Sequence, residues 1–157
     1  MSQLSFKNVG VKGFKQEEVL NKNRTQLPIG IKTPVQLSPD GQGLFAMHTD
    51  IKEQIADNLR NLILTNWGER LGNYFFGSNL RPLLADFSHK DDFDNEAMIR
   101  INTAITKYMP FITPMAYESK TYRPVDSPIA KAEIILIYSV EALGITNAAL
   151  KVNLFGI

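Results

Sequence analysis

The chain has 157 residues, enough for one domain with a substantial buried core. Apolar residues make up 44% and charged residues 21%, which is ordinary for a globular protein and far from the composition of a disordered chain. The 17 Lys and Arg residues nearly balance the 16 Asp and Glu residues, so the formal charge is +1. This near-balance argues against a dedicated nucleic-acid-binding protein, which normally carries a basic stripe.

The counts of Cys and His limit the chemistry further. The chain has no Cys, which excludes disulfides, thiolate zinc sites and cysteine nucleophiles. Its two histidines, His48 and His89, are too few for a His-rich metal centre, so we expect neither a metal nor a cofactor. No apolar run approaches the roughly 18 residues of a membrane span, and the first residues lack the apolar core of a signal peptide. We therefore expect a soluble protein made in the cytoplasm that binds no membrane.

The N-terminal third is expected to be extended. Residues 1–26 are polar and alternate poorly, which predicts an arm that becomes ordered against a partner. Residues 28–47 combine strand-like alternation, interrupting prolines and a turn signal at residues 38–43, which predicts a hairpin-like excursion. We place the domain boundary after the arm, so that residues 27–157 form a single domain.

Two amphipathic helices are expected in the middle of the chain. Asp50 and Glu53 form a capping box ahead of apolar residues at helical spacing, which predicts a helix over residues 50–65. A second helix is predicted over residues 94–108, because acidic residues gather at its start and Pro110 follows its end. Residues 66–92 between them show no clear period, apart from a short helical turn expected at Leu80–Ala85. The aromatic residues of this loop are expected to pack within the loop or the core.

The last third is expected to form strands over residues 112–121, 132–142 and 147–155. The run over residues 134–138 is apolar on both faces, which predicts a central strand or one covered by a partner. The terminal strand is expected at a sheet edge. The predicted fold class is therefore α+β, with two amphipathic helices packed on a small antiparallel sheet and an extended N-terminal arm or hairpin.

Catalytic chemistry has weak support. Glu69 and Asp86 are mid-loop carboxylates outside the helix caps, but a general acid needs a raised pKa and the neighbouring Arg70 favours a lowered one at Glu69. The glycines at 68 and 72 form neither a phosphate-binding loop nor a dinucleotide-binding motif. We expect no enzyme, and keep a murein hydrolase that uses Glu69, assisted by Asp86, as the alternative.

The run IADNLRNLILTNWGERLGNYFFGSNLRPLL has a more specific pattern. An amphipathic helix ends in Leu and Thr, and is followed by Gly-Glu-Arg, then by a Phe-Gly pair and a leucine. This pattern resembles the baseplate-wedge, sheath-initiator family of contractile phage tails, which includes a wedge subunit of the type VI secretion system and has members labelled lysozyme-like. The residues that carry the resemblance are Leu62 to Thr65, Gly68, Glu69, Arg70, Phe76, Gly77 and Leu80.

The resemblance implies a structural wedge subunit that docks on the wedge core and seeds sheath assembly by offering β-strands. The family commonly has Glu-Pro-Arg after the second helix, where it engages the central helical bundle of the wedge. This chain has Met109, Pro110 and Phe111 there, so we expect an apolar contact instead. The candidates for docking the sheath are Leu150, Val152 and Leu154 in the terminal strand, which we expect to be removable without unfolding the protein.

The implied partners are the sheath protein, the other wedge subunits and the tube or hub proteins, with roughly six copies of this chain per baseplate. The implied location is the baseplate of a virion tail, assembled in the host cytoplasm. Gly68 is expected to hold a backbone conformation that is closed to β-branched residues. An interaction domain unrelated to tails, with an accidental motif match, remains the third interpretation.

Overall fold

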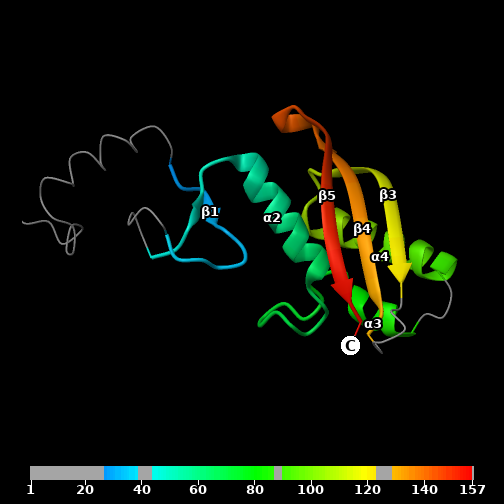
Figure 1. Ribbon diagram of the computed structural model, residues 1–157. Helices are drawn as coiled ribbons and strands as arrows, with labels where there is room; N and C mark the ends of the chain where they lie inside the picture. The colour runs from blue at the N-terminus through cyan, green and yellow to red at the C-terminus, as the bar shows by residue number, and fades with distance from the viewer. Residues whose placement is uncertain (1–26, 39–43, 87–89, 123–128, 157) are drawn as a thin grey trace, which may run out of the picture. The chain divides into compact units, whose positions relative to one another are not determined.

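The computed structural model of the chain (Figure 1) describes residues 27–38, 44–86, 90–122 and 129–156. The chain divides into two compact units, residues 1–54 and residues 55–157, and each is described by itself. The predicted arm, residues 1–26, lies outside the described residues, so the arm and the boundary after it stay predictions.

The first unit contains the predicted hairpin. Strand β1 (Gly30–Ile31) pairs antiparallel with β2 (Met47–His48), and an isolated bridge between Leu37 and Phe45 continues the pairing. The strands are short because Pro28 and Pro34 flank β1, and proline cannot donate a ladder hydrogen bond.

A carboxylate ties this hairpin to the start of helix α2 (Ile51–Leu64). Asp50 caps the helix as predicted, since its Oδ1 accepts a hydrogen bond from the Lys52 backbone N–H at 2.9 Å. Glu53 does not complete the predicted capping box. Its Oε2 instead lies 3.3 Å from His48 Nδ1 and 3.7 Å from Lys32 Nζ, so it joins the helix to both arms of the hairpin.

The described residues of the first unit include many large apolar side chains that are exposed. A two-stranded hairpin alone is marginally stable in water, and these side chains form no core of their own. The exposed residues are Leu27, Ile29, Ile31, Val35, Leu37, Leu44, Phe45, Met47 and Ile51.

The second unit is built on a three-stranded antiparallel sheet with the order β3 (Thr113–Tyr122), β4 (Lys131–Val140), β5 (Ile145–Phe155). The strand with two apolar faces, β4, is central, and the terminal strand is at an edge, as predicted. The predicted strand over residues 132–142 ended too late, because residues Glu141–Leu143 form a 3-10 turn that leads into β5. Gly144 closes this turn in the left-handed region, with φ of 62°.

Helices α3 (Leu80–Asp86) and α4 (Lys90–Tyr108) lie behind the sheet in Figure 1. The predicted helical turn at residue 80 is helix α3, with Pro82 in its first turn. Helix α4 begins earlier than predicted, at Lys90 instead of residue 94. The α+β class is confirmed, with a third helix added.

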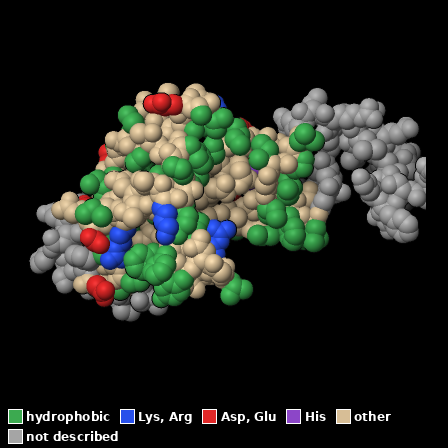
Figure 2. Space-filling view, turned by 180° about the vertical axis from the view of Figure 1, so that it is seen from behind, with side chains coloured by type: hydrophobic (Ala, Val, Ile, Leu, Met, Phe, Trp, Pro, Cys, Tyr) green, Lys and Arg blue, Asp and Glu red, His purple; other side chains and the backbone are tan. Residues whose placement is uncertain are grey.

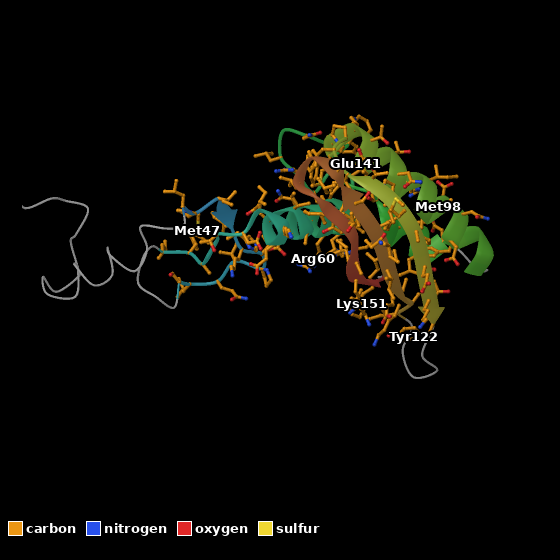
Figure 3. All side chains as sticks on the ribbon, turned by 90° about the horizontal axis from the view of Figure 1, so that it is seen from above. Met47, Arg60, Met98, Tyr122, Glu141 and Lys151 are labelled. Carbon is orange, nitrogen blue, oxygen red and sulfur yellow. The ribbon has the colours of Figure 1, made fainter. Side chains whose placement is uncertain are left out.

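The core lies between the helices and one face of the sheet. Along β4, Ile134 and Leu136 are buried against the helices, whereas Ile135 and Ile137 are half-buried on the opposite, open face. In Figure 3, Lys151 of β5 lies on the side of the sheet away from α4. The helices supply most of the remaining core, namely Ile55, Leu59, Leu62, Ile63, Leu80, Leu83, Leu84, Phe93, Ala97, Ile101, Ala104 and Ile105.

Candidate functional site

The loop between α2 and α3, residues 65–79, folds back against the end of α2. The backbone N–H of Ser78 donates to the Leu62 carbonyl at 3.1 Å, and that of Asn79 donates to the Thr65 carbonyl at 3.3 Å. At Gly77, φ is +108° and an added Cβ would lie 2.1 Å from the Thr65 carbonyl oxygen. Glycine is therefore required at this crossing both for its conformation and for the close approach of two backbones.

The Gly-Glu-Arg segment forms the far end of the same loop. Gly68 has φ of +85°, which confirms the predicted conformation, and its N–H donates to the Tyr74 carbonyl at 2.7 Å. The Trp67 indole N–H donates to the Gly77 carbonyl at 3.2 Å. The loop is thus held by its own hydrogen bonds as well as by α2.

Glu69 organises the loop. Its carboxylate accepts hydrogen bonds from the backbone N–H and the side-chain amide of Asn66, both at 2.8 Å, and lies 3.7 Å from Arg81 Nη1. The Asn66 hydrogen bonds, with a smaller contribution from Arg81, lower the pKa of Glu69. The predicted direction is confirmed, but the cation beside this carboxylate is Arg81 and not the adjacent Arg70.

Arg70 points to a different set of partners. Its guanidinium lies over the Phe76 ring, 4.1 Å from the ring centroid, and Phe76 packs against Tyr108 of α4 with centroids 4.9 Å apart. The Tyr108 hydroxyl is 3.3 Å from Asn73 Oδ1 in the loop. Arg70 and Phe76 therefore join the loop to the end of α4.

A groove of about 610 Å³ lies where the loop, the end of α2 and the end of α4 meet. It brings together two sets of residues singled out in the sequence: Glu69, Arg70 and Phe76 from the loop, and Met109 and Phe111 after α4. Its other walls are Asn58, Asn61, Leu62, Thr65 and Tyr108.

The three residues after α4 differ in exposure. Met109 is buried and its N–H still donates to the Ile105 carbonyl at 2.8 Å, whereas Pro110 is exposed and Phe111 is 49% exposed. Phe111 is therefore the exposed aromatic residue of this segment. Leu80, the last residue of the family pattern, is fully buried as the first residue of α3 and contributes to the core.

The aromatic residues beside the groove are more exposed than predicted. Phe75 contacts both Trp67 and Tyr74 edge to face, but 46% of Trp67, 63% of Tyr74 and 58% of Phe75 remain exposed to solvent. Leu71 is fully exposed at the loop tip. Figure 2 shows hydrophobic side chains gathered in the lower part of the molecule, next to Lys and Arg side chains. Exposed apolar side chains grouped in this way mark an interaction surface.

Sequence reasoning missed the residues that hold this site together. Asn66 and Arg81 bind Glu69, and Tyr108 forms a wall of the groove, but none of them was singled out as a site residue. Asn66 and Arg81 carry no local signal, because their roles depend on how the loop closes. The only sequence signal at Tyr108 was its helical spacing, which predicts a helix and not a wall of a groove.

The terminal strand places its candidate docking side chains elsewhere than expected. Leu150, Val152 and Leu154 are buried in the core beneath the sheet, so they are unavailable to a partner. Removing this strand would strip three core residues, and the expectation that the protein would stay folded without it is withdrawn.

The backbone of β5 does present an edge. The Gly156 N–H donates to the Ala130 carbonyl at 2.8 Å, and antiparallel pairing alternates every second residue. The N–H and C=O groups of Ala149, Lys151 and Asn153 are therefore directed away from β4. Within the described residues no strand pairs with them.

The opposite edge is less open. Strand β3 contains Pro114 and a register shift beside it. Both features disfavour the addition of another strand, because they interrupt the regular row of backbone donors and acceptors at the edge. Ser119, further along β3, is buried and hydrogen-bonded to Asp94 of α4. Edge β5 is the one suited to strand addition.

The other candidate residues do not assemble a site. His48 is buried in the first unit beside Glu53, Asp86 is exposed at the end of α3, and His89 lies outside the described residues. The described residues contain no group of three or more His, Asp or Glu side chains placed to hold a metal ion. None of the described helices is long and apolar enough to cross a membrane.

Comparison with known proteins gives a fold but no sequence family. No protein-family model and no curated protein matches the chain. The structure is similar to that of a proposed tail lysozyme from Geobacter sulfurreducens, with a TM-score of 0.58 and 18% identity over 71% of this chain and 96% of that one. It is also similar to a chain in the baseplate of the anti-feeding prophage, with a TM-score of 0.54 and 19% identity over 71% of this chain and 85% of that one. At these identities the likeness establishes a shared fold.

The crossing at Gly77 gives a stability prediction. Gly77→Ala should lower the free energy of unfolding by about 3 kcal/mol or more, because a strained φ costs roughly 1–3 kcal/mol and the clash with Thr65 adds to it. Gly72→Ala is the matched control, since Gly72 has φ of +81° but nothing within 4 Å of the added Cβ, and it should cost about 1–2 kcal/mol from the backbone strain alone. Urea unfolding measures the free energy of unfolding of both variants. Equal losses in the two would contradict the close backbone approach at Gly77.

The lowered pKa of Glu69 gives a pH dependence. A carboxylate with a lowered folded-state pKa stabilises the protein above its unfolded-state pKa, and this contribution disappears as the pH falls through the folded-state value. Wild type should therefore be more stable than Glu69→Gln at pH 7, and the difference should shrink on acidification. Asn66→Ala removes a donor and should make the difference smaller at pH 7. A difference independent of pH in urea titrations would refute this role.

Proposed function

We propose that the chain is a non-catalytic structural subunit of the baseplate of a contractile injection machine, with a phage tail as the machine most consistent with the sequence pattern. Its support is the fold it shares with a chain of the anti-feeding prophage baseplate, together with the Gly-Glu-Arg and Phe-Gly pattern. The single observation that carries the proposal is the groove, because it joins that pattern to Met109 and Phe111 in one surface.

In this proposal the groove is the contact with the core of the baseplate wedge. A buried Met109 supports a half-exposed Phe111, and Arg70 is stacked on Phe76 beside them. Aromatic and Arg side chains on a formed pocket are typical of the residues that dominate binding energy at interfaces. The apolar residues exposed in the first unit fit a protein that works inside an assembly, where partners cover such surfaces.

The outer edge of β5 is the proposed docking site for the sheath. Its contribution is backbone hydrogen bonding by Ala149, Lys151 and Asn153, and not the buried side chains singled out in the sequence. The partners in this proposal are the sheath protein, the other wedge subunits and the tube or hub proteins, with several copies of the chain in each tail baseplate.

A murein hydrolase is the second candidate, because the Geobacter sulfurreducens structure carries a lysozyme description. A glycosidase general acid must hold its proton near neutral pH, and Glu69 has the opposite property, since its pKa is lowered and its oxygens bind Asn66 and Arg81. We expect no clearing of a purified cell-wall suspension by the wild-type chain. Clearing that Glu69→Gln abolishes would replace the structural proposal with this one.

The groove contact predicts a selective loss of partner capture. Phe111→Ala should weaken capture of the wedge subunits about tenfold or more, because truncating an interface anchor typically costs more than 1 kcal/mol. Leu143→Ala is a matched control, since Leu143 is similarly exposed, at 42% against 49%, but does not line the groove. Affinity purification of the tagged chain from cells producing its neighbouring gene products, followed by mass spectrometry, measures both. Equal capture by the two variants would contradict the groove contact.

The β5 edge predicts a position-specific effect on sheath assembly. Asn153→Pro removes an outward-directed N–H without breaking a hydrogen bond to β4, so the variant should stay folded but fail to nucleate sheath. Asn153→Ala keeps the N–H and should nucleate as wild type does. Sheath assembly followed by electron microscopy, with circular dichroism to check folding, separates the two variants. A folded proline variant that nucleates normally would exclude strand addition at this edge.

A further inference from the structure

The tip of the loop between α2 and α3 is an apolar projection that the fold holds in place. All the residues from 67 to 75 are exposed. The Asn73 N–H donates to the Arg70 carbonyl at 3.2 Å and closes a turn, and Leu71, inside this turn, is fully exposed. In Figure 1 the loop projects from the end of α2, away from the sheet. Because hydrogen bonds within the loop hold it, the exposure of these side chains is a property of the folded protein.

Aromatic rings lie at the base of the same turn. The Gly68 N–H donates to the Tyr74 carbonyl at 2.7 Å, so Trp67 and Phe75, which flank this pair, lie further from the tip than Leu71 does. Phe75 contacts the rings of Trp67 and Tyr74, with centroids 5.8 Å and 5.1 Å apart. Trp and Tyr prefer a boundary between an apolar medium and water, since each combines an apolar ring with a polar group. The loop therefore changes from aliphatic at its tip to aromatic at its base.

Two cations lie beside these rings. The Arg70 guanidinium lies over the Phe76 ring, and Lys107 Nζ is 6.0 Å from the Phe75 ring centroid. In the part of the chain that the structure describes, neither cation forms an ion pair. The one acid of the loop, Glu69, is already bound by an amide and by another arginine. The charge left around the projection is therefore positive, which is complementary to an anionic surface.

The shape and the order of these side chains favour a lipid surface over a protein. A protein that covered a fully exposed leucine at the tip of a projection would need a matching pocket, whereas acyl chains close around any inserted side chain. From tip to base, the loop offers an aliphatic residue, aromatic rings and cations. A bilayer offers hydrocarbon, an interfacial layer that aromatic rings prefer, and anionic headgroups in the same order. Contact of this kind requires no helix that spans the membrane.

We propose that the loop inserts into the surface of an anionic lipid bilayer, with Leu71 among the acyl chains, the aromatic rings in the interfacial layer, and Arg70 and Lys107 at the lipid phosphates. This inference goes beyond the proposed function, because neither Leu71 nor the rings at the base of the turn line the groove. The contact is shallow and reversible, since one short loop buries little apolar surface in the bilayer.

The experiment uses the single Trp of the chain, Trp67, which lies in this loop. The purified full chain is mixed with vesicles of equal parts phosphatidylglycerol and phosphatidylcholine, and the Trp emission is recorded. We expect a shift to shorter wavelength, and quenching when the acyl chains carry bromine, because the indole enters a less polar layer. Binding should weaken as salt is added, and it should be several-fold weaker on vesicles of phosphatidylcholine alone.

Matched variants test the roles of the tip and of the cations. Leu71→Ser should weaken vesicle binding about tenfold or more, because the apolar side chain that enters the hydrocarbon is lost. Leu143→Ser, in an exposed leucine outside the loop, should bind vesicles as wild type does. Lys107→Ala should weaken binding to the anionic vesicles about fivefold. Circular dichroism verifies that each variant remains folded.

The outcomes separate a lipid surface from a protein partner. Trp emission that is unchanged by the anionic vesicles overturns the inference, and so do equal effects of Leu71→Ser and Leu143→Ser on vesicle binding. If Leu71→Ser lowers the capture of other subunits while wild type binds no vesicles, the projection contacts a protein and the inference is wrong. The capture experiment with Phe111→Ala tests the baseplate proposal separately, so either proposal can fail without the other.

Discussion

The crossing of two backbones at Gly77 and Thr65 is the constraint on which the groove depends. A side chain at Gly77 would occupy the space of the Thr65 carbonyl, so only glycine lets the loop fold back on the end of α2. Because the loop returns there, Phe76 reaches Tyr108 and the residues after α4 become a wall of the same groove. The hydrogen bonds from Ser78 and Asn79 to the end of α2 hold that arrangement. The groove is thus built on local backbone geometry as well as on side-chain contacts.

The neighbours Glu69 and Arg70 divide two tasks between them. The Glu69 carboxylate turns inward to the backbone and side-chain N–H groups of Asn66 and to Arg81, and these contacts close the loop. The same contacts lower the pKa of Glu69. Arg70 turns to the Phe76 ring instead, with its guanidinium carbon 4.1 Å from the ring centroid. If the two had paired with each other, the loop would lose its closing contacts and the groove would lose its cation. The geometry of this loop therefore gives each residue of the Gly-Glu-Arg pattern a structural role.

The elements with strong periodicity were predictable from the sequence, and the site was predictable only in parts. The spacing of Ile55, Leu59 and Leu62 identified α2, and the doubly apolar run identified β4 as central. The pattern also singled out Glu69 and Arg70, but their partners are set by loop closure, which leaves no local sequence signal. The error on β5 has a physical cause. Alternation identifies which side chains share a face, but not whether that face meets the protein's own core or a partner. Leu150, Val152 and Leu154 meet the core.

The central claim is that the groove beside the Gly-Glu-Arg loop contacts another protein of a baseplate. The most direct measurement replaces Phe111 with the photoreactive amino acid benzoylphenylalanine, which is similar in shape, and irradiates assembled particles. The account predicts a cross-link from this position to one other baseplate subunit, and none to a partner from the same substitution at the exposed Leu143, which lies outside the groove. A position that stays uncross-linked in assembled particles, or that reacts only with its own chain, would contradict the account.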